Sequence, residues 1–211
     1  MNIVVLISGR GSNLQSIIDK KEKGELDITI AAVISNVPDV LGLQRAKKAG
    51  IDIHVINHEK FASREAFDQS LEDCIDQYRP QLVVLAGFMR VLSPAFVAHY
   101  QGRLINIHPA LLPKFPGLNT HRRAIEAGEK EHGVSVHFVT AEVDGGPVIA
   151  QTKVEIKADD TADTLATRVL EQEHILYPHV LRWFCENRIT LKNKGVYFDN
   201  VRLGAEGMVL N

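Results

Sequence analysis

The feature that most constrains the fold of this chain is a regular alternation of short apolar runs with helical patterns. Strands are predicted at residues 2–7, 28–34, 52–56, 82–86, 104–108, 133–139 and 147–156, and helices at 12–22, 40–49, 63–78, 94–100, 119–127 and 161–187. Strict β-α repetition in the first half calls for a mostly parallel sheet with helices on both faces. Two strands that follow closely around Asp144 indicate an antiparallel addition in the C-terminal part. The predicted fold class is α/β, an open, twisted, Rossmann-like sheet, with a hairpin or irregular structure in the tail 190–203.

Length and composition favour one domain over residues 1–211. With 45% hydrophobic and 24% charged residues, the chain can bury a core of ordinary globular size. A net charge of −2 gives no broad basic surface for nucleic acid or membrane. The two cysteines form no metal-binding spacing, no signal peptide is recognised, and no apolar run approaches the ~20 residues needed to cross a bilayer. These observations predict a cytoplasmic protein.

The segment Asn106-Ile107-His108-Pro109 is the first candidate for chemistry. Asn106 and His108 stand two apart on a predicted strand, so their side chains leave the same face, about 7 Å apart. At a strand end, an amide can donate to a developing oxyanion and an imidazole can carry a proton. Asp144 lies in a turn stiffened by two glycines and a proline, and beside His108 it would raise the pKa of the imidazole. The plainer interpretation of Asp144 is an Asx turn that bonds to its own backbone.

A second candidate is the loop Ser8-Gly9-Arg10-Gly11-Ser12-Asn13, between the first predicted strand and helix. Its glycines let the backbone approach an anion, and the amides at a helix start point toward it, which favours a phosphate site. We expect Ser12 or Asn13 to cap the helix. The plainer interpretation is a tight turn that needs glycine. A dinucleotide site is disfavoured because Leu14 stands where the third glycine belongs and no acidic residue ends the second strand.

Three further features are candidates for contact with a ligand. Glu173 falls on the apolar stripe of the last helix, where a carboxylate is either paired or faces a cleft. The apolar loop 87–92 follows a predicted buried strand, and it either walls a flat aromatic ligand or closes the core. Arg64 begins a helix, and it is either solvated or meets an acidic ligand tail.

The remaining histidines receive plainer interpretations. His54 and His58 are four apart but span a strand and a loop, so they form no helical metal pair. His132 and His137 lack a partner cluster, whereas His121 follows the loop framed by Pro109 and Pro113 and is a candidate for lining a cleft. We therefore expect no metal site.

Together these motifs resemble the phosphoribosylglycinamide formyltransferases, or GAR transformylases, of the folate-dependent formyltransferase family. The resemblance runs along nearly the whole chain, through Ser8-Gly9-x-Gly11-Ser12-Asn13, Leu85-Ala86-Gly87-Phe88-Met89-Arg90, Asn106-Ile107-His108-Pro109, Asp144-Gly145-Gly146-Pro147 and Gln172-Glu173-His174. It implies an enzyme of de novo purine biosynthesis that transfers the formyl group of 10-formyltetrahydrofolate, its co-substrate, to the amine of 5-phosphoribosylglycinamide. Ala110 departs from the serine that often follows the His-Pro pair, and Asn119 from a histidine found in some members.

The resemblance also implies roles for individual residues. Asn106, His108 and Asp144 would be catalytic, with Asn106 and a protonated His108 stabilising a tetrahedral oxyanion. Gly11, Ser12 and Asn13 would bind the substrate phosphate, and Glu173 the ribose or glycinamide end. The folate would contact Arg64, Met89, Arg90, Val91, Leu92, Asn106, Thr140, Ala141, Glu142, Val143 and Asp144. The predicted domain then divides into a phosphate-binding half, 1–100, and a catalytic and folate-binding half, 101–211.

Other functions fit the same sequence less well. Methionyl-tRNA formyltransferase resembles this catalytic half but carries an additional C-terminal domain and a basic surface. Formyltetrahydrofolate deformylase has an extra N-terminal domain and lacks the Gly-Ser-Asn loop. A nucleotide-binding oxidoreductase is disfavoured by Leu14, and a non-catalytic binding protein would be expected to lose part of the catalytic set. The expected partners are small molecules rather than nucleic acid or membrane, and the expected state is a monomer or weak homodimer.

Overall fold

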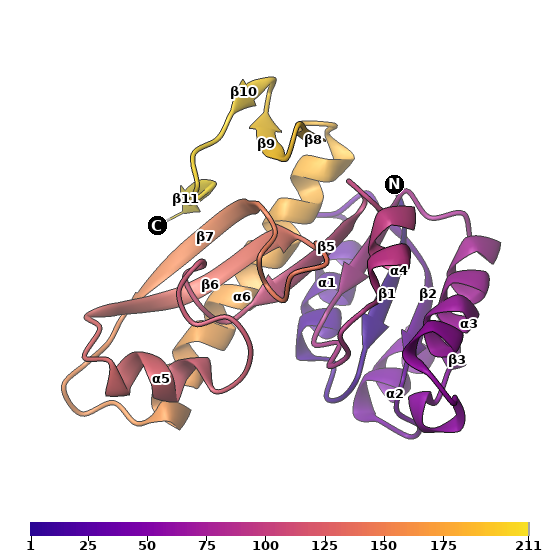
Figure 1. Cartoon of the computed structure of the whole chain (residues 1–211), viewed down its shortest axis with the longest axis horizontal. Helices are drawn as coiled ribbons and strands as arrows, with labels where there is room; N and C mark the ends of the chain where they lie inside the picture. Colours follow the sequence, from indigo (N-terminus) through magenta and orange to yellow (C-terminus); the bar gives the residue numbers. More distant parts are fainter. Residues whose placement is uncertain (211) are drawn as a thin grey trace. The chain divides into compact units, whose positions relative to one another are not determined.

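A parallel sheet forms the centre of the first of two compact units, which meet in sequence between Asn106 and Ile107. The structure is a computed structural model, and it describes residues 1–210. In the first unit the strands run parallel in the order β5-β4-β1-β2-β3 (Figure 1). Their bounds are β1 (Asn2–Ile7), β2 (Thr29–Ser35), β3 (Asp52–Val55), β4 (Leu82–Leu85) and β5 (Leu104–His108). β4 is buried throughout and β1 is buried from Ile3 onward, which explains their almost continuous apolar sequences.

Helices α1 (Ser12–Glu22), α2 (Leu41–Lys48), α3 (Arg64–Gln77) and α4 (Pro94–His99) connect these strands, and a short 3-10 helix, η1 (His58–Lys60), precedes α3. Right-handed crossovers place α1 and α2 on one face of the sheet and α3 and α4 on the other. The two helices of each pair lie in contact. The direction in which successive strands are added to the sheet reverses at β1, since β2 lies on one side of β1 and β4 on the other. Ligands of open α/β sheets bind outside the carboxyl ends of the strands at such a point.

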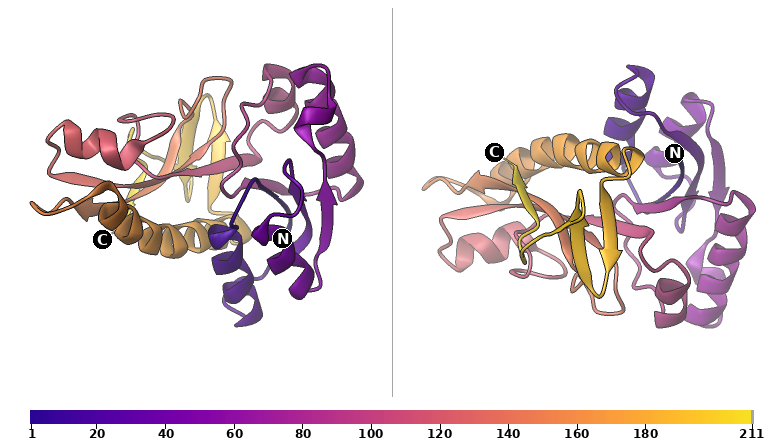
Figure 2. Two further views of the ribbon diagram at one scale, coloured as in Figure 1. Left: turned by 90° about the horizontal axis from the view of Figure 1, so that it is seen from below. Right: turned by 90° about the horizontal axis from the view of Figure 1, so that it is seen from above.

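The second unit is built around an antiparallel pair. Strand β6 (Glu131–Phe138) pairs with β7 (Val148–Glu155), and β11 (Met208–Leu210) adds to β7 in parallel. The long helix α6 (Ala162–Cys185) packs along β6 and β7 (Figure 2) and also contacts the short helix α5 (Thr120–Glu126). Strands β8 (Ile189–Lys192), β9 (Gly195–Phe198) and β10 (Val201–Arg202) form a separate small antiparallel sheet.

The predicted fold class is confirmed: the sheet is mostly parallel, with antiparallel strands in the C-terminal part. Every predicted strand and helix is present, with ends that differ by no more than two residues. The predicted hairpin in the tail corresponds to the β8-β9-β10 sheet, whereas β11 was not expected. The assignment of the whole chain to one domain stays a prediction. None of the helices within residues 1–210 is long and apolar enough to cross a membrane.

One local prediction is wrong. Helix α1 is preceded by Gly11 in the left-handed conformation, φ 67° and ψ 35°, so neither Ser12 nor Asn13 is the N-cap. A Cβ atom on Gly11 would lie 2.6 Å from the Cα atom of Gly42. The cap position is therefore set by backbone conformation and close packing, and a hydrogen-bonding side chain has no place there.

Candidate active site

His108 occupies the end of β5 and is buried, with 5% of its surface exposed. Its Nε2 lies 2.9 Å from the carbonyl oxygen of Phe115. A carbonyl oxygen can only accept, so Nε2 carries a proton and donates it there. Its other nitrogen, Nδ1, lies 3.4 Å from Oδ2 of Asp144. An imidazolium at this position would therefore have an acceptor for each N–H group.

Asp144 lies in the turn between β6 and β7 with φ 50°, a left-handed conformation that is uncommon outside glycine. Its Oδ2 accepts a hydrogen bond from the backbone N–H of Gly117 at 2.8 Å. Its Oδ1 lies 3.6 Å from Nε2 of His137, which is an electrostatic contact rather than a good hydrogen bond. A Cβ atom on Gly146 would lie 1.7 Å from the carbonyl oxygen of Phe138, so this turn requires glycine at that position.

Burial and neighbouring groups set the ionisation of this pair. Burial lowers the pKa of His108 below its usual value by more than the Phe115 carbonyl and Asp144 raise it. For Asp144, burial raises the pKa, but His137 and the Gly117 N–H outweigh burial and hold the pKa below its usual value. The resting site therefore favours a neutral imidazole beside a carboxylate anion. Asp144 raises the pKa of His108 as expected, but desolvation is the larger effect, so the pKa is lowered overall.

A buried polar group holds the loop that follows His108. The Ser135 hydroxyl donates to the carbonyl oxygen of Ala110 at 2.6 Å and accepts from the N–H of Leu112 at 3.0 Å. The Gln151 amide donates to the carbonyl of Leu112 at 2.9 Å and to the Ser135 hydroxyl at 2.7 Å. Sequence reasoning missed both side chains. The available signal was a polar residue inside each of two strands that are otherwise largely apolar.

Two histidines were wrongly judged to lack partners. His137 contacts Asp144, and Nε2 of His132 lies 3.2 Å from Nδ1 of His121. Burial, reinforced by the charge of His121, lowers the pKa of His132 to about 4. The pKa of His121 is also lowered, first by burial and then by His108. In the second unit, His108, His121 and His132 therefore all favour the neutral form, which strand and loop spacing could not reveal.

In the first unit, Gly11, Ser12 and Asn13 lie together at the start of α1, as expected of a phosphate-binding loop. Gly42 closes tightly behind this loop, because a Cβ atom there would lie 2.4 Å from the Ile7 side chain. This packing leaves no room for a side chain at Gly11 or Gly42. The N-terminal amides of α1 are therefore presented by a rigid loop, a geometry that suits an anion.

The loop after β4 exposes apolar side chains. Met89 is 66% exposed and Val91 50%, while Phe88 and Leu92 are buried. Arg90 is also exposed. Exposed apolar side chains between two buried ones are consistent with a surface that a flat ligand covers. Elsewhere in this unit, Arg64 is exposed at the first position of α3, and Asn106 is half-buried on β5 opposite Leu85.

The second unit contains the remaining predicted contacts. Glu173 is 8% exposed and lies on the buried stripe of α6 with Leu165, Val169 and Leu176. Thr140 is half-buried, whereas Ala141, Glu142 and Val143 are exposed in the turn that leads to Asp144. The three residues directly before Asp144 are therefore exposed to solvent.

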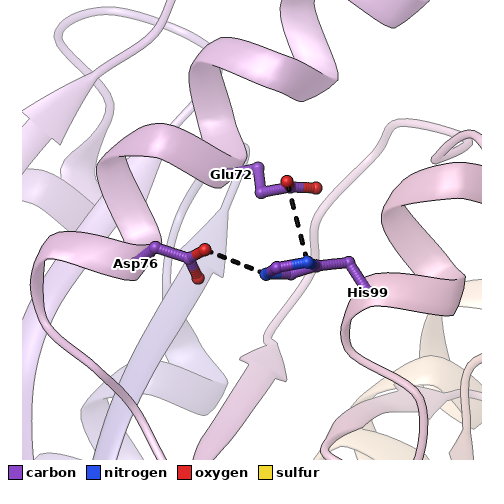
Figure 3. A group of neighbouring side chains, drawn as sticks. All are labelled: Glu72, Asp76 and His99. Atoms are coloured by element: carbon purple, nitrogen blue, oxygen red, sulfur yellow. Dashed lines mark hydrogen bonds and ion pairs between the residues drawn. The ribbon is translucent and has the colours of Figure 1, made fainter.

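One group among the described residues has the composition of a metal site (Figure 3). His99 of α4 lies between two carboxylates of α3, with Nε2 2.9 Å from Asp76 and Nδ1 3.7 Å from Glu72. The Tyr100 hydroxyl donates to the other oxygen of Asp76 at 2.8 Å. Each nitrogen of the ring faces a different carboxylate, so the group as arranged is a charge cluster between two helices and not a coordination sphere.

Comparison with known proteins gives a consistent result. The formyl transferase family model matches residues 1–181. The phosphoribosylglycinamide formyltransferase of Escherichia coli (strain K12) is 56% identical over 207 residues, covering 98% of each chain. The trifunctional purine biosynthetic protein adenosine-3 of Drosophila melanogaster is 51% identical over 181 residues, which are 85% of this chain but 13% of that protein.

Solved structures agree with the sequence relatives. The phosphoribosylglycinamide formyltransferase of Coxiella burnetii superposes with a TM-score of 0.97 at 55% identity, over 100% of this chain and 99% of that one. The predicted family and the predicted enzyme class are confirmed. The chain therefore belongs to the formyl transferase family, and within it to the phosphoribosylglycinamide formyltransferases, enzymes of purine biosynthesis.

Proposed function

We propose that the formyl group is transferred from 10-formyltetrahydrofolate to the amine of 5-phosphoribosylglycinamide by direct attack, with Asn106, His108 and Asp144 as the catalytic residues. The contact of His108 Nδ1 with Asp144 Oδ2, at 3.4 Å, carries this proposal. This contact places the neutral imidazole of His108, which can carry a proton, beside a carboxylate that stabilises the protonated ring.

The amine nitrogen forms a bond to the formyl carbon, and the carbonyl oxygen becomes an oxyanion. The bond from that carbon to N10 of the folate then breaks. The amine loses one proton and N10 gains one, so the reaction needs a group that can take a proton and return it. His108 suits this role because burial keeps its pKa below the usual value, which leaves the ring neutral when the amine attacks.

Asp144 stabilises the imidazolium that forms during transfer. Its own low pKa keeps the carboxylate charged, and the Gly117 N–H bond holds Oδ2 in place. Asn106 would donate its amide N–H to the oxyanion, an interaction whose removal costs on the order of 10²–10³ in turnover in comparable sites. In the substrate complex the neutral ring would carry its proton on Nδ1, toward Asp144, so that Nε2 leaves the Phe115 carbonyl and is free to take the proton of the amine.

The substrates would occupy the two kinds of loop already described. Gly11, Ser12 and Asn13 would hold the phosphate through backbone amides, and Glu173 would accept from the ribose or glycinamide end. Met89–Leu92 and Thr140–Asp144 would enclose the pterin, with Arg64 toward the acidic tail of the folate. The exposed apolar side chains of Met89 and Val91 support the folate assignment.

Further features of the proposal follow from the same chemistry. No metal is needed, because a proton carrier and hydrogen-bond donors account for each step. The partners would be small molecules alone, the protein would act as a monomer or weak homodimer, and the reaction would take place in the cytoplasm. The net charge of −2 supports the absence of a nucleic-acid substrate.

The experiment follows the absorbance change of a 10-formyl folate when it is mixed with protein and 5-phosphoribosylglycinamide. We expect turnover that requires the amine and that falls at least a hundredfold in His108→Ala and Asp144→Asn. Loss of formyl without the amine would instead indicate a hydrolase. Turnover of the amine that survives both substitutions would contradict the assigned roles.

A further inference from the structure

We propose that Ser8 and Asn36 are positioning residues, which hold the backbone of Met89 where the formyl folate binds. The inference rests on the proposed function, because it takes residues 89–92 as part of the folate site. Neither side chain needs to touch a substrate for this role. Ser8, Asn36 and Met89 all lie in the first compact unit.

Ser8 joins the ends of two neighbouring strands. It follows β1, and its backbone N–H donates to the carbonyl of Gly87, just after β4, at 3.1 Å. The N–H of Met89 donates in return to the Ser8 hydroxyl at 2.7 Å. These two hydrogen bonds connect the loop after β4 to Ser8, the first residue of the candidate phosphate loop.

Further hydrogen bonds extend as a chain from Ser8 to Asn36 and His58. The Ser8 hydroxyl donates to Oδ1 of Asn36 at 2.5 Å, and Asn36 follows β2 with 3% of its surface exposed. Nδ1 of His58, which follows β3, lies 3.0 Å from the backbone carbonyl oxygen of Asn36 and 3.1 Å from its Nδ2. The chain thus crosses the carboxyl ends of β4, β1, β2 and β3, which are neighbours in the sheet.

The Ser8 hydroxyl is the donor in its hydrogen bond with Asn36 and the acceptor in its hydrogen bond with Met89. A hydroxyl has one proton, and Oδ1 of Asn36 can only accept, so the proton of Ser8 is committed to Asn36. The lone pairs of Ser8 are thereby turned toward the N–H of Met89. Asn36 therefore acts on Met89 through Ser8 and has no separate bond to it.

The hydrogen bond from the Met89 N–H to Ser8 is important for the position of this loop. Met89 and Val91 expose 66% and 50% of their surface, so packing does not hold the middle of the loop. Backbone hydrogen bonds must set its position instead. Loss of the anchor is expected to weaken the binding of whatever the loop contacts, with little effect on the chemistry at His108.

The first test is the KM-against-kcat split of Ser8→Ala. We expect the KM for 10-formyl folate to rise about tenfold, as for one donor left without its partner. The kcat and the KM for 5-phosphoribosylglycinamide should change by less than about twofold. Ser70→Ala is the matched control, because the Ser70 hydroxyl makes no hydrogen bond within the described residues, and it should behave like the parent protein. A folate KM within about twofold of the parent value in Ser8→Ala would overturn the inference.

The second test is a double-mutant cycle. Asn36→Ala should raise the folate KM in the same direction but less, since Met89 keeps its acceptor. The double variant Ser8→Ala/Asn36→Ala should be no worse than Ser8→Ala alone, because Asn36 acts through Ser8. Additive effects would mean that the two side chains act independently, which contradicts the proposed chain.

The third test does not depend on activity or on any variant folding well. Hydrogen exchange in the parent protein should find the Met89 amide protected and the Arg90 amide faster, and rapid exchange at Met89 would overturn the inference. The two proposals fail differently. A parent protein without amine-dependent turnover contradicts the function, whereas normal turnover with an unchanged folate KM in Ser8→Ala contradicts only the positioning role.

Discussion

Backbone groups make the candidate phosphate site of the first unit, whereas buried titratable side chains make the candidate catalytic pair of the second, His108 and Asp144. In the first, Gly11 and Gly42 pack so closely that no side chain fits, and the helix amides remain. In the second, burial shifts the pKa of His108, His121 and His132 downward, while His137 and the Gly117 N–H hold that of Asp144 low. Shape therefore dominates one site and electrostatics the other, and they should respond to different perturbations.

The largest effect is expected where one charged side chain is removed from the second unit. Asp144→Asn keeps the shape of the turn but removes the charge that stabilises protonated His108, so turnover should fall by about 10²–10³. Steady-state turnover measures this directly. Asp159→Asn, a change of the same kind at an exposed position, should leave turnover unchanged. A fall of less than about tenfold in Asp144→Asn would show that electrostatics do not dominate this site.

Acid should destabilise the protein through the same unit. The folded pKa of His132 is about 4, below the usual ~6.5 of an unfolded chain, so the folded state resists protonation. Its contribution is complete above about pH 6.5 and is lost as the pH falls toward 4, by up to about 3 kcal/mol. Urea unfolding at pH 7.5 and 4.5 measures the free energy of unfolding at each pH, and the difference between the two should be smaller in His132→Asn. An equal acid loss in His132→Asn would exclude this histidine as the cause.

Gly11→Ala tests the importance of shape in the first unit. A side chain at φ 67° costs about 1–2 kcal/mol, and the new Cβ atom would also clash with Gly42. The KM for 5-phosphoribosylglycinamide should rise at least tenfold, whereas Ser12→Ala, which preserves the backbone amide, should raise it less than about threefold. The reverse ranking of the two variants would assign phosphate binding to the Ser12 hydroxyl.

The smallest effect is expected at Arg64. This side chain is exposed, so its attraction to an acidic folate tail is screened by water and salt. Arg64→Ala should raise the KM for a folate by about two- to fivefold at low salt, and the difference should shrink at 0.5 M salt. A salt-independent rise would indicate packing rather than charge.

The same contrast explains what the sequence could predict. Spacing of glycines and apolar runs led to the sheet, the helices and the Gly11–Asn13 loop, because these features are local in sequence. The α1 cap was predicted wrongly because its cause, Gly42, lies thirty-one positions beyond Gly11. The contact of His137 with Asp144 depends on the turn geometry between β6 and β7, which no spacing rule contains.

Ionisation was the hardest property to predict. The sequence placed Asp144 near His108 and gave the correct sign of that one interaction, but the net pKa depends on how completely the ring is buried. Ser135 and Gln151 were overlooked for a related reason, since a polar residue on a strand has no evident partner until the loop Ala110–Leu112 folds over it. Burial is a property of the assembled fold, so these residues emerge only from the structure.

The most direct test of the account is the fate of the formyl carbon. The protein is mixed with 10-formyltetrahydrofolate labelled with ¹³C in the formyl group and with 5-phosphoribosylglycinamide, and the reaction is followed by carbon NMR. We expect the label to move from the folate to the amine as a formamide, and Asp144→Asn to slow this transfer at least a hundredfold. Release of the label as free formate, at a rate independent of the amine, would contradict it.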